Sequence, residues 1–184
     1  MVFIHDTRQA LIAGVGLVNT LPGFDGEDRL QTLADLDAYL AANPYTGDIR
    51  RDEEELAALR AVRRRLRALW SVGRDEAVPL LNAMLRDGNA LPQLTIHDGY
   101  DWHIHATDDD APLATRIMVE VAMAFVDVIR ADQWSRVRVC SADDCESVYI
   151  DYSKNGSKRY CDEGNCGNRM NVNAYRQRKA AETA

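Results

Sequence analysis

The chain has 184 residues, of which 46% are hydrophobic and 28% are charged, and its formal net charge is −7 at pH 7. This length allows one well-packed core, or one domain with a small appendage, and the composition excludes fibrous and low-complexity proteins. The negative charge argues against general nucleic-acid binding. The first residues lack the basic region of a signal peptide, and Glu120 and Asp127 interrupt the longest apolar stretch. We therefore expect a cytoplasmic protein that does not enter a membrane.

Charge is unevenly distributed along the chain. From Arg136 to the end there are nine Lys and Arg against seven Asp and Glu, whereas the preceding residues hold 13 basic and 22 acidic side chains. All four cysteines also lie in the last stretch. This asymmetry predicts two units, residues 1–134 and residues 135–184.

Helical periodicity dominates the first unit. Leucine and valine recur at helical spacing, which predicts helices over residues 7–20, 28–42, 51–73, 75–88 and 108–132. The arginines of the third helix are interpreted as a solvent-exposed face. Pro79 is compatible with the fourth helix only if it lies in the first turn. Trp70, Trp102 and Trp134 are assigned to the core.

Residues 91–110 alternate apolar and polar side chains around Asp98-Gly99, which predicts a β-hairpin. His103 and His105 lie two residues apart and therefore share one face of a strand. We favour a plain sheet-face pair over a pair of metal ligands, because no cysteine or third ligand is nearby in the sequence. The acidic residues 108–110 are interpreted as the N-terminal cap of the next helix. The first unit is thus predicted to be mainly α with a small β component.

The cysteines have the spacing C-x4-C-x15-C-x4-C, at Cys140, Cys145, Cys161 and Cys166. Two short cysteine pairs favour a structural zinc site with four thiolates, and a reducing compartment favours metal over disulfides. Disulfides or unrelated buried thiols are the alternatives. Strands over residues 147–152 and 157–161, joined by a turn at Asn155-Gly156, and a terminal helix complete a treble-clef-like finger.

The same residues carry a family resemblance. "CSADDC", "KNGSKRYCDEGNCGNR" and the basic tail resemble the CGNR zinc-finger family, named for the tetrapeptide at Cys166–Arg169. The first unit, with "LVNT" at Leu17–Thr20, resembles the ABATE domain, a stress-induced transcription regulator domain. Gly16 stands where that family usually has aspartate, and Tyr160 where the finger often has tryptophan. The resemblance implies a DNA-binding transcription regulator that acts in a stress response.

Two residues of the triplet after Cys166 are assigned structural roles. Gly167 permits close backbone approach to the metal, and Asn168 hydrogen-bonds backbone or cysteine sulfur. Arg169 either pairs with an internal carboxylate or contacts a phosphate or guanine. The candidate DNA-contacting residues are Lys154, Lys158, Arg159, Arg169, Arg176, Arg178 and Lys179.

The sequence also leaves open a second function for the finger and further roles for the helical unit. A zinc-scaffolded protein-interaction module without DNA binding is the alternative function. The first unit is expected to sense a signal or to dimerise, so a homodimer and a small-molecule ligand in the helical domain are further expectations. We expect no enzymatic activity, because four cysteines close the coordination of zinc and no nucleophile–base pair is visible.

Overall fold

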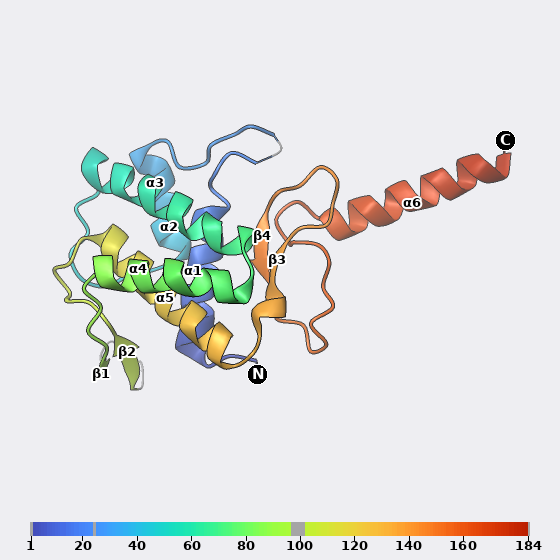
Figure 1. Cartoon of the computed structure of the whole chain (residues 1–184). Helices are drawn as coiled ribbons and strands as arrows, with labels where there is room; N and C mark the ends of the chain where they lie inside the picture. Colours follow the sequence, from blue (N-terminus) through green and yellow to red (C-terminus); the bar gives the residue numbers. More distant parts are fainter. Residues whose placement is uncertain (1, 24, 97–101, 184) are drawn as a thin grey trace.

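Six α-helices and two short antiparallel hairpins make up the described part of the chain (Figure 1). The computed structural model describes residues 2–23, 25–96 and 102–183. The helices are α1 (His5–Val18), α2 (Leu33–Ala42), α3 (Glu53–Arg67), α4 (Arg74–Asp87), α5 (Leu113–Arg130) and α6 (Cys166–Thr183). The strands are β1 (Gln93–Thr95), β2 (His103–His105), β3 (Val137–Val139) and β4 (Val148–Ile150), with 3-10 turns η1 (Ala68–Ser71) and η2 (Trp134–Arg136). The predicted fold class, mainly α with a small β component, is confirmed.

Helix α5 is the centre of the helical part and packs against α1, α3 and α4. Ile117 and Phe125 on its inner face are fully buried. Its closest neighbour is α1, where Gly14 faces Val121. A Cβ atom on Gly14 would lie 2.8 Å from Val121 Cγ1, so the two helices can approach this closely only with glycine at that position.

Several helix ends differ from the predicted ones. α2 begins at Leu33 and not near residue 28, because Thr32 caps it: the Thr32 side chain accepts from Asp35 N–H, and the Asp35 carboxylate accepts from Thr32 N–H. Pro79 is the sixth residue of α4 and not part of its first turn, so that expectation was wrong. A proline there removes one hydrogen bond inside the helix.

The acidic residues 108–110 do not cap α5. The helix begins at Leu113, and Pro112 is the capping position, without a side-chain hydrogen bond to the helix. The backbone of Pro112 is extended, with φ −51° and ψ 136°, which places the three aspartates in a separate turn before the helix. They therefore lie too far upstream to reach the first N–H groups of α5, and the cap interpretation was wrong.

The arginines of α3 are not all solvent-exposed as predicted. Arg63 is only 2% exposed, and its guanidinium donates to both carboxylate oxygens of Asp28, at 2.7 and 2.5 Å. The same guanidinium donates to the carbonyl of Thr20 at 2.9 Å. This ion pair ties the segment after α1 to α3, and removing Asp28 would leave the buried Arg63 charge without its carboxylate partner.

Glu120 on α5 is a largely buried carboxyl group. Burial raises its pKa from 4.5 to about 7, although the nearby Arg116 opposes this change. Because the folded-state pKa exceeds the unfolded value, ionised Glu120 destabilises the fold increasingly as the pH rises from 4.5 to 7. We expect Glu120→Gln to stabilise the protein by about 3 kcal/mol above pH 7, and hardly at all near pH 4.5. Urea unfolding at several pH values measures this; a pH-independent difference would contradict it.

The second hairpin joins the cysteine-rich segment to the helices. β3 and β4 pair antiparallel, with Val137 opposite Ile150 and Val139 opposite Val148. The expectation that residues 157–161 form the second strand was wrong, because β3, which precedes the first cysteine, takes that place. Val148 and Ile150 are buried in the same core as the helices. Trp70 from η1 also donates to the carbonyl of Tyr149 at 3.3 Å. The hairpin therefore closes one end of the helical core.

The first hairpin has the opposite character, because its apolar face is exposed. Leu94 on β1 lies opposite Ile104 on β2, and these side chains are 68% and 47% exposed. Trp102 is 64% exposed, so its assignment to the core was wrong, whereas Trp70 is buried. The predicted turn at Asp98-Gly99 lies outside the described residues. The hairpin projects from the end of the helical part away from α6 (Figure 1).

Candidate zinc centre and basic surface

The four cysteine sulfurs converge on one point. All four Sγ atoms lie within 4.8 Å of one another, and the pairs Cys145–Cys161 and Cys161–Cys166 are each 3.7 Å apart. A tetrahedral ion with zinc–sulfur bonds of about 2.3 Å separates its ligand atoms by roughly 3.8 Å. The cysteines therefore match the size of a zinc ion, and Zn²⁺ is the cofactor of this centre.

The burial of the sulfurs fits a closed structural metal site. Cys140, Cys161 and Cys166 are buried, at 7%, 4% and 0% exposed, and Cys145 is partly buried. Burial raises the pKa of the Cys161 thiol to about 12. A doubly charged cation would stabilise the ionised thiolates and displace the thiol protons, as zinc does in structural sites.

Within the Gly-Asn-Arg triplet after Cys166, the arginine and not the asparagine contacts a cysteine sulfur. Asn168 is exposed, and no hydrogen bond from its side chain to a cysteine sulfur occurs among the described residues. A Cβ atom on Gly167 would come no closer than 3.7 Å to Tyr160, so this contact does not require glycine. It is Arg169 that contacts a ligand, donating to Cys166 Sγ at 3.2 Å.

Arg169 also connects the two cysteine pairs. Its guanidinium donates to both oxygens of Asp144, at 2.5 and 2.9 Å, and Asp144 lies between Cys140 and Cys145. A two-pronged contact of this kind is directional and joins one cysteine loop to the other. The position of Arg169 thus matches the internal alternative considered for it.

Replacing Arg169 is expected to weaken zinc retention. Arg169→Ala removes the donor to Cys166 Sγ and leaves Asp144 beside four thiolates, so we expect a loss of 10- to 100-fold in zinc affinity, roughly the size found for groups that orient metal ligands. Competition with a chromophoric chelator measures it. Arg159→Ala, which changes an exposed arginine in the same segment, is the matched control and should leave the affinity unchanged. Equal affinities for all three proteins would contradict the role given to Arg169.

Two arginines outside the predicted DNA-contacting set organise the loop after β4. Asp151 is fully buried and accepts N–H groups of Ser153 and Lys158, at 2.8 and 2.7 Å. Arg136 donates to the carbonyl of Asp151 at 2.8 Å, and Arg138 donates to that of Lys158 at 2.9 Å. These side chains satisfy backbone groups of the loop that a neighbouring strand would otherwise bond, so residues 157–161 are held in place without forming a strand.

Asn19, in the "LVNT" stretch, joins α1 to the finger. Its side-chain amide donates to the carbonyl of Val148 at 3.0 Å and its oxygen accepts the N–H of the same residue at 2.8 Å. One asparagine therefore satisfies both backbone groups of a buried strand residue, as a neighbouring strand would. Only the motif itself pointed to Asn19 in the sequence, and its partner is 129 residues away.

The candidate DNA-contacting residues fall into two groups. Lys158 forms an ion pair with Asp162 and lies 5.6 Å from the Tyr149 ring, and Arg169 is engaged by Asp144. Five others are exposed: Lys154, Arg159, Arg176, Arg178 and Lys179. The last three belong to α6, which extends away from the rest of the molecule (Figure 1).

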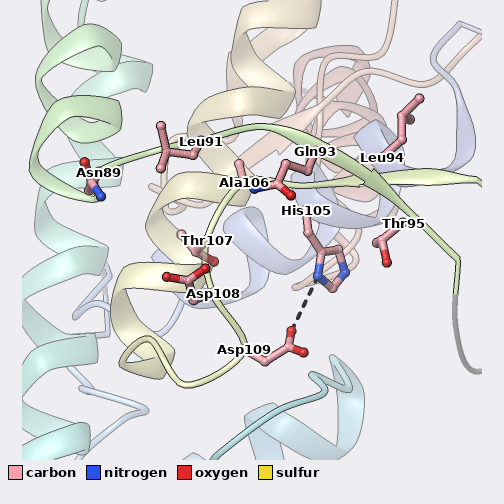
Figure 2. A pocket seen from close by; sticks show the side chains of 10 residues that line it. All are labelled: Asn89, Leu91, Gln93, Leu94, Thr95, His105, Ala106, Thr107, Asp108 and Asp109. Carbon is pink, nitrogen blue, oxygen red and sulfur yellow. Dashed lines mark ion pairs between the residues drawn. The ribbon is translucent and has the colours of Figure 1, made fainter.

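Two surface pockets lie in the helical part. One of about 240 Å³ is lined by β1, β2 and the turn before α5, including His105 and Asp109 (Figure 2). The other, of about 400 Å³, lies beside α2 and includes Tyr45 and Arg51. Neither identifies a small-molecule ligand. Within the described ranges, no helix is long and apolar enough to span a membrane.

A helical unit closed by a hairpin that leads into a four-cysteine metal centre defines a zinc-finger protein with a helical N-terminal domain. Comparison with family models agrees with this: residues 136–179 match the CGNR zinc finger, and residues 13–132 match ABATE, described as "Putative stress-induced transcription regulator". Because the second match covers more than half of the chain, the chain belongs to the ABATE family. A search of curated proteins finds no match.

Proposed function

We propose that the chain is a transcription regulator that binds DNA through its zinc finger, with α6 as the main contacting element. The observation that carries this proposal is the position of α6. Every side chain from residue 171 to residue 181 is exposed, and the helix begins at the zinc ligand Cys166. An isolated helix of this length is marginally stable in water, so a partner surface along it would stabilise it.

The chemistry of α6 fits a nucleic-acid groove. Between Cys166 and residue 181 the helix has four basic residues and no acidic one. Val172, Tyr175, Arg176 and Lys179 follow the spacing of one helical face, which combines apolar contact with positive charge. The major groove of DNA, about 12 Å wide, admits an α-helix. The finger thus offers a local basic surface on an otherwise acidic protein.

The test is binding of zinc-loaded protein to fragmented genomic DNA over a salt series. With the five exposed basic residues as phosphate contacts, log K should fall with log salt at a slope of about −4 to −5. Affinity should then drop roughly 300- to 1,000-fold between 50 and 200 mM salt. Absence of binding at low salt, with zinc confirmed by elemental analysis, would shift the function to the protein-interaction alternative. The proposal includes no catalytic step, because four thiolates fill a tetrahedral zinc site.

For the helical part we propose dimerisation through the β1–β2 hairpin. Leu91, Leu94, Ile96, Trp102 and Ile104 are all 47–68% exposed, and an exposed group of large apolar side chains is typical of a protein interface. Pairing of two such faces would bring two fingers onto one DNA molecule, which raises the effective affinity of each.

Sedimentation velocity tests this dimer. The zinc-loaded chain should sediment as a dimer at micromolar concentration, and Leu94→Asp combined with Ile104→Asp should convert it to a monomer. Val78→Asp, which alters an exposed apolar residue on α4 that is 38% exposed, should remain dimeric. A monomeric wild-type chain would refute dimerisation while leaving the DNA proposal standing.

A further inference from the structure

The two histidines of β2 converge on one face of the first hairpin. Their Nε2 atoms are 3.2 Å apart, and the rings meet at 68° with centroids separated by 4.9 Å. Both side chains are partly buried. Residues two apart on a strand point to the same side, so the backbone of β2 holds this arrangement.

The separation of these nitrogens matches two ligands of one metal ion. Bonds of about 2.0–2.1 Å from zinc to imidazole nitrogen, at a tetrahedral angle, separate two nitrogens by roughly 3.3–3.4 Å. The same comparison holds at the cysteine centre, where sulfurs 3.7 Å apart match the edge of a zinc–sulfur tetrahedron. An N–H···N hydrogen bond between two neutral rings is the competing explanation for 3.2 Å.

Asp109 supplies a second observation. Its Oδ1 atom lies 3.7 Å from Nδ1 of His105 (Figure 2). His103 contacts the other ring nitrogen of His105, Nε2. A carboxylate facing Nδ1 favours the tautomer that carries its proton there, and in that tautomer Nε2 is the nitrogen that can coordinate a metal ion. Histidines that bind metals commonly have such a carboxylate partner. Asp109 lies in the turn before α5, and this position lets its carboxylate orient the His105 ring.

We propose that His103 and His105 bind one divalent late first-row transition-metal ion, such as Zn²⁺, Ni²⁺ or Co²⁺, with Asp109 orienting His105. Imidazole nitrogen is a preferred ligand of these ions. The adjoining polar pocket of about 240 Å³, with Gln93, Thr95 and Asp108 on its wall, gives room for water molecules to complete the coordination. Among the described residues, the cysteines are the one group of three or more ligands that converge, so the histidine site binds more weakly than the finger.

This site is separate from the finger. The β1–β2 hairpin and the β3–β4 hairpin lie at different ends of the helical part (Figure 1). Both histidine ligands belong to β2, and neither site shares a ligand with the other. The inference therefore stands whether or not the finger binds DNA.

Equilibrium dialysis of the full chain against Zn²⁺, with metal counted by elemental analysis, tests the site. At about 100 µM free zinc, tenfold above a dissociation constant of about 10 µM, we expect two ions per chain. His103→Ala and His105→Ala should each retain one ion, held by the cysteines. His5→Ala, which changes an exposed histidine at the start of α1, should retain two. Asp109→Asn should weaken the second ion by about tenfold.

Two results would overturn the proposal. One is a single ion per wild-type chain, which would leave the hydrogen bond between neutral rings as the explanation. The other is two ions per chain in both histidine variants. Nuclear magnetic resonance of the imidazole nitrogens in the wild-type chain gives an independent readout: zinc must shift the signals of His103 and His105 after the cysteines are saturated. Unchanged imidazole signals would count against the site even if a variant failed to fold.

Discussion

Removal of zinc is expected to lower the melting temperature of the helical part as well as to disorder the finger. Val148 and Ile150 of β4 belong to the helical core, and they follow closely after Cys145 in the chain. If the metal-free finger cannot hold β4, the core loses these side chains, at a cost of about 3 kcal/mol. For a chain of this size that loss corresponds to a fall of roughly 6–12 °C. Thermal melts followed by far-ultraviolet circular dichroism, with and without chelator, measure it.

Asn19 provides the control for this coupling. Asn19→Ala should lower the free energy of unfolding of the zinc-loaded protein by about 1–3 kcal/mol, because it leaves both backbone groups of buried Val148 without partners. In the metal-free protein the same change should cost much less, since β4 is already released. Gln9→Ala, an exposed amide on the same helix, should have no effect in either state. Identical melting with and without zinc would mean that the helices fold independently of the finger.

Reversal of three charges on α6 is expected to abolish DNA binding. The combined variant Arg176→Glu, Arg178→Glu and Lys179→Glu replaces three phosphate contacts by three repulsive groups, so we expect an affinity at least about 100-fold lower at low salt. The corresponding triple alanine variant should bind weakly, with a salt slope reduced by about 2.7. Both variants should keep their zinc and their melting temperature, because these side chains are exposed and far from the cysteines along the helix.

A charge-matched control separates local contact from net charge. Arg64→Glu, Arg86→Glu and Arg130→Glu make the same change in net charge on exposed positions of the helical part. This control should bind DNA within a few-fold of wild type, since the reversed charges lie outside the proposed contact surface. If both triple variants lose affinity equally, overall charge and not α6 governs binding, and the assignment of α6 fails.

Much of the architecture was predictable from the sequence, because it depends on local pattern. Helical periodicity gave the helices that became α1 to α5, with errors of a few residues at their ends. The cysteine spacing gave the zinc ligands, because each short loop delivers two sulfurs from one turn. Alternation likewise predicted the first hairpin. These features depend on neighbours within a few residues, which a sequence displays directly.

The tertiary structure alone decided which distant groups meet. Arg169 was equally suited to a carboxylate or a phosphate, and its pairing with Asp144, 25 residues away, was settled by how the two cysteine loops fold together. The sequence placed Arg63 on a solvent-exposed face, but in the folded chain the segment after α1 lies over it and Asp28 pairs with its guanidinium. The turn at residues 155–156 favours pairing of β4 with residues 157–161. β4 pairs with β3 instead, in an arrangement that buries Val148 and Ile150 against the helices. Side-chain type and period determine what a residue can do, whereas the crossing of distant chain segments determines which partner it finds.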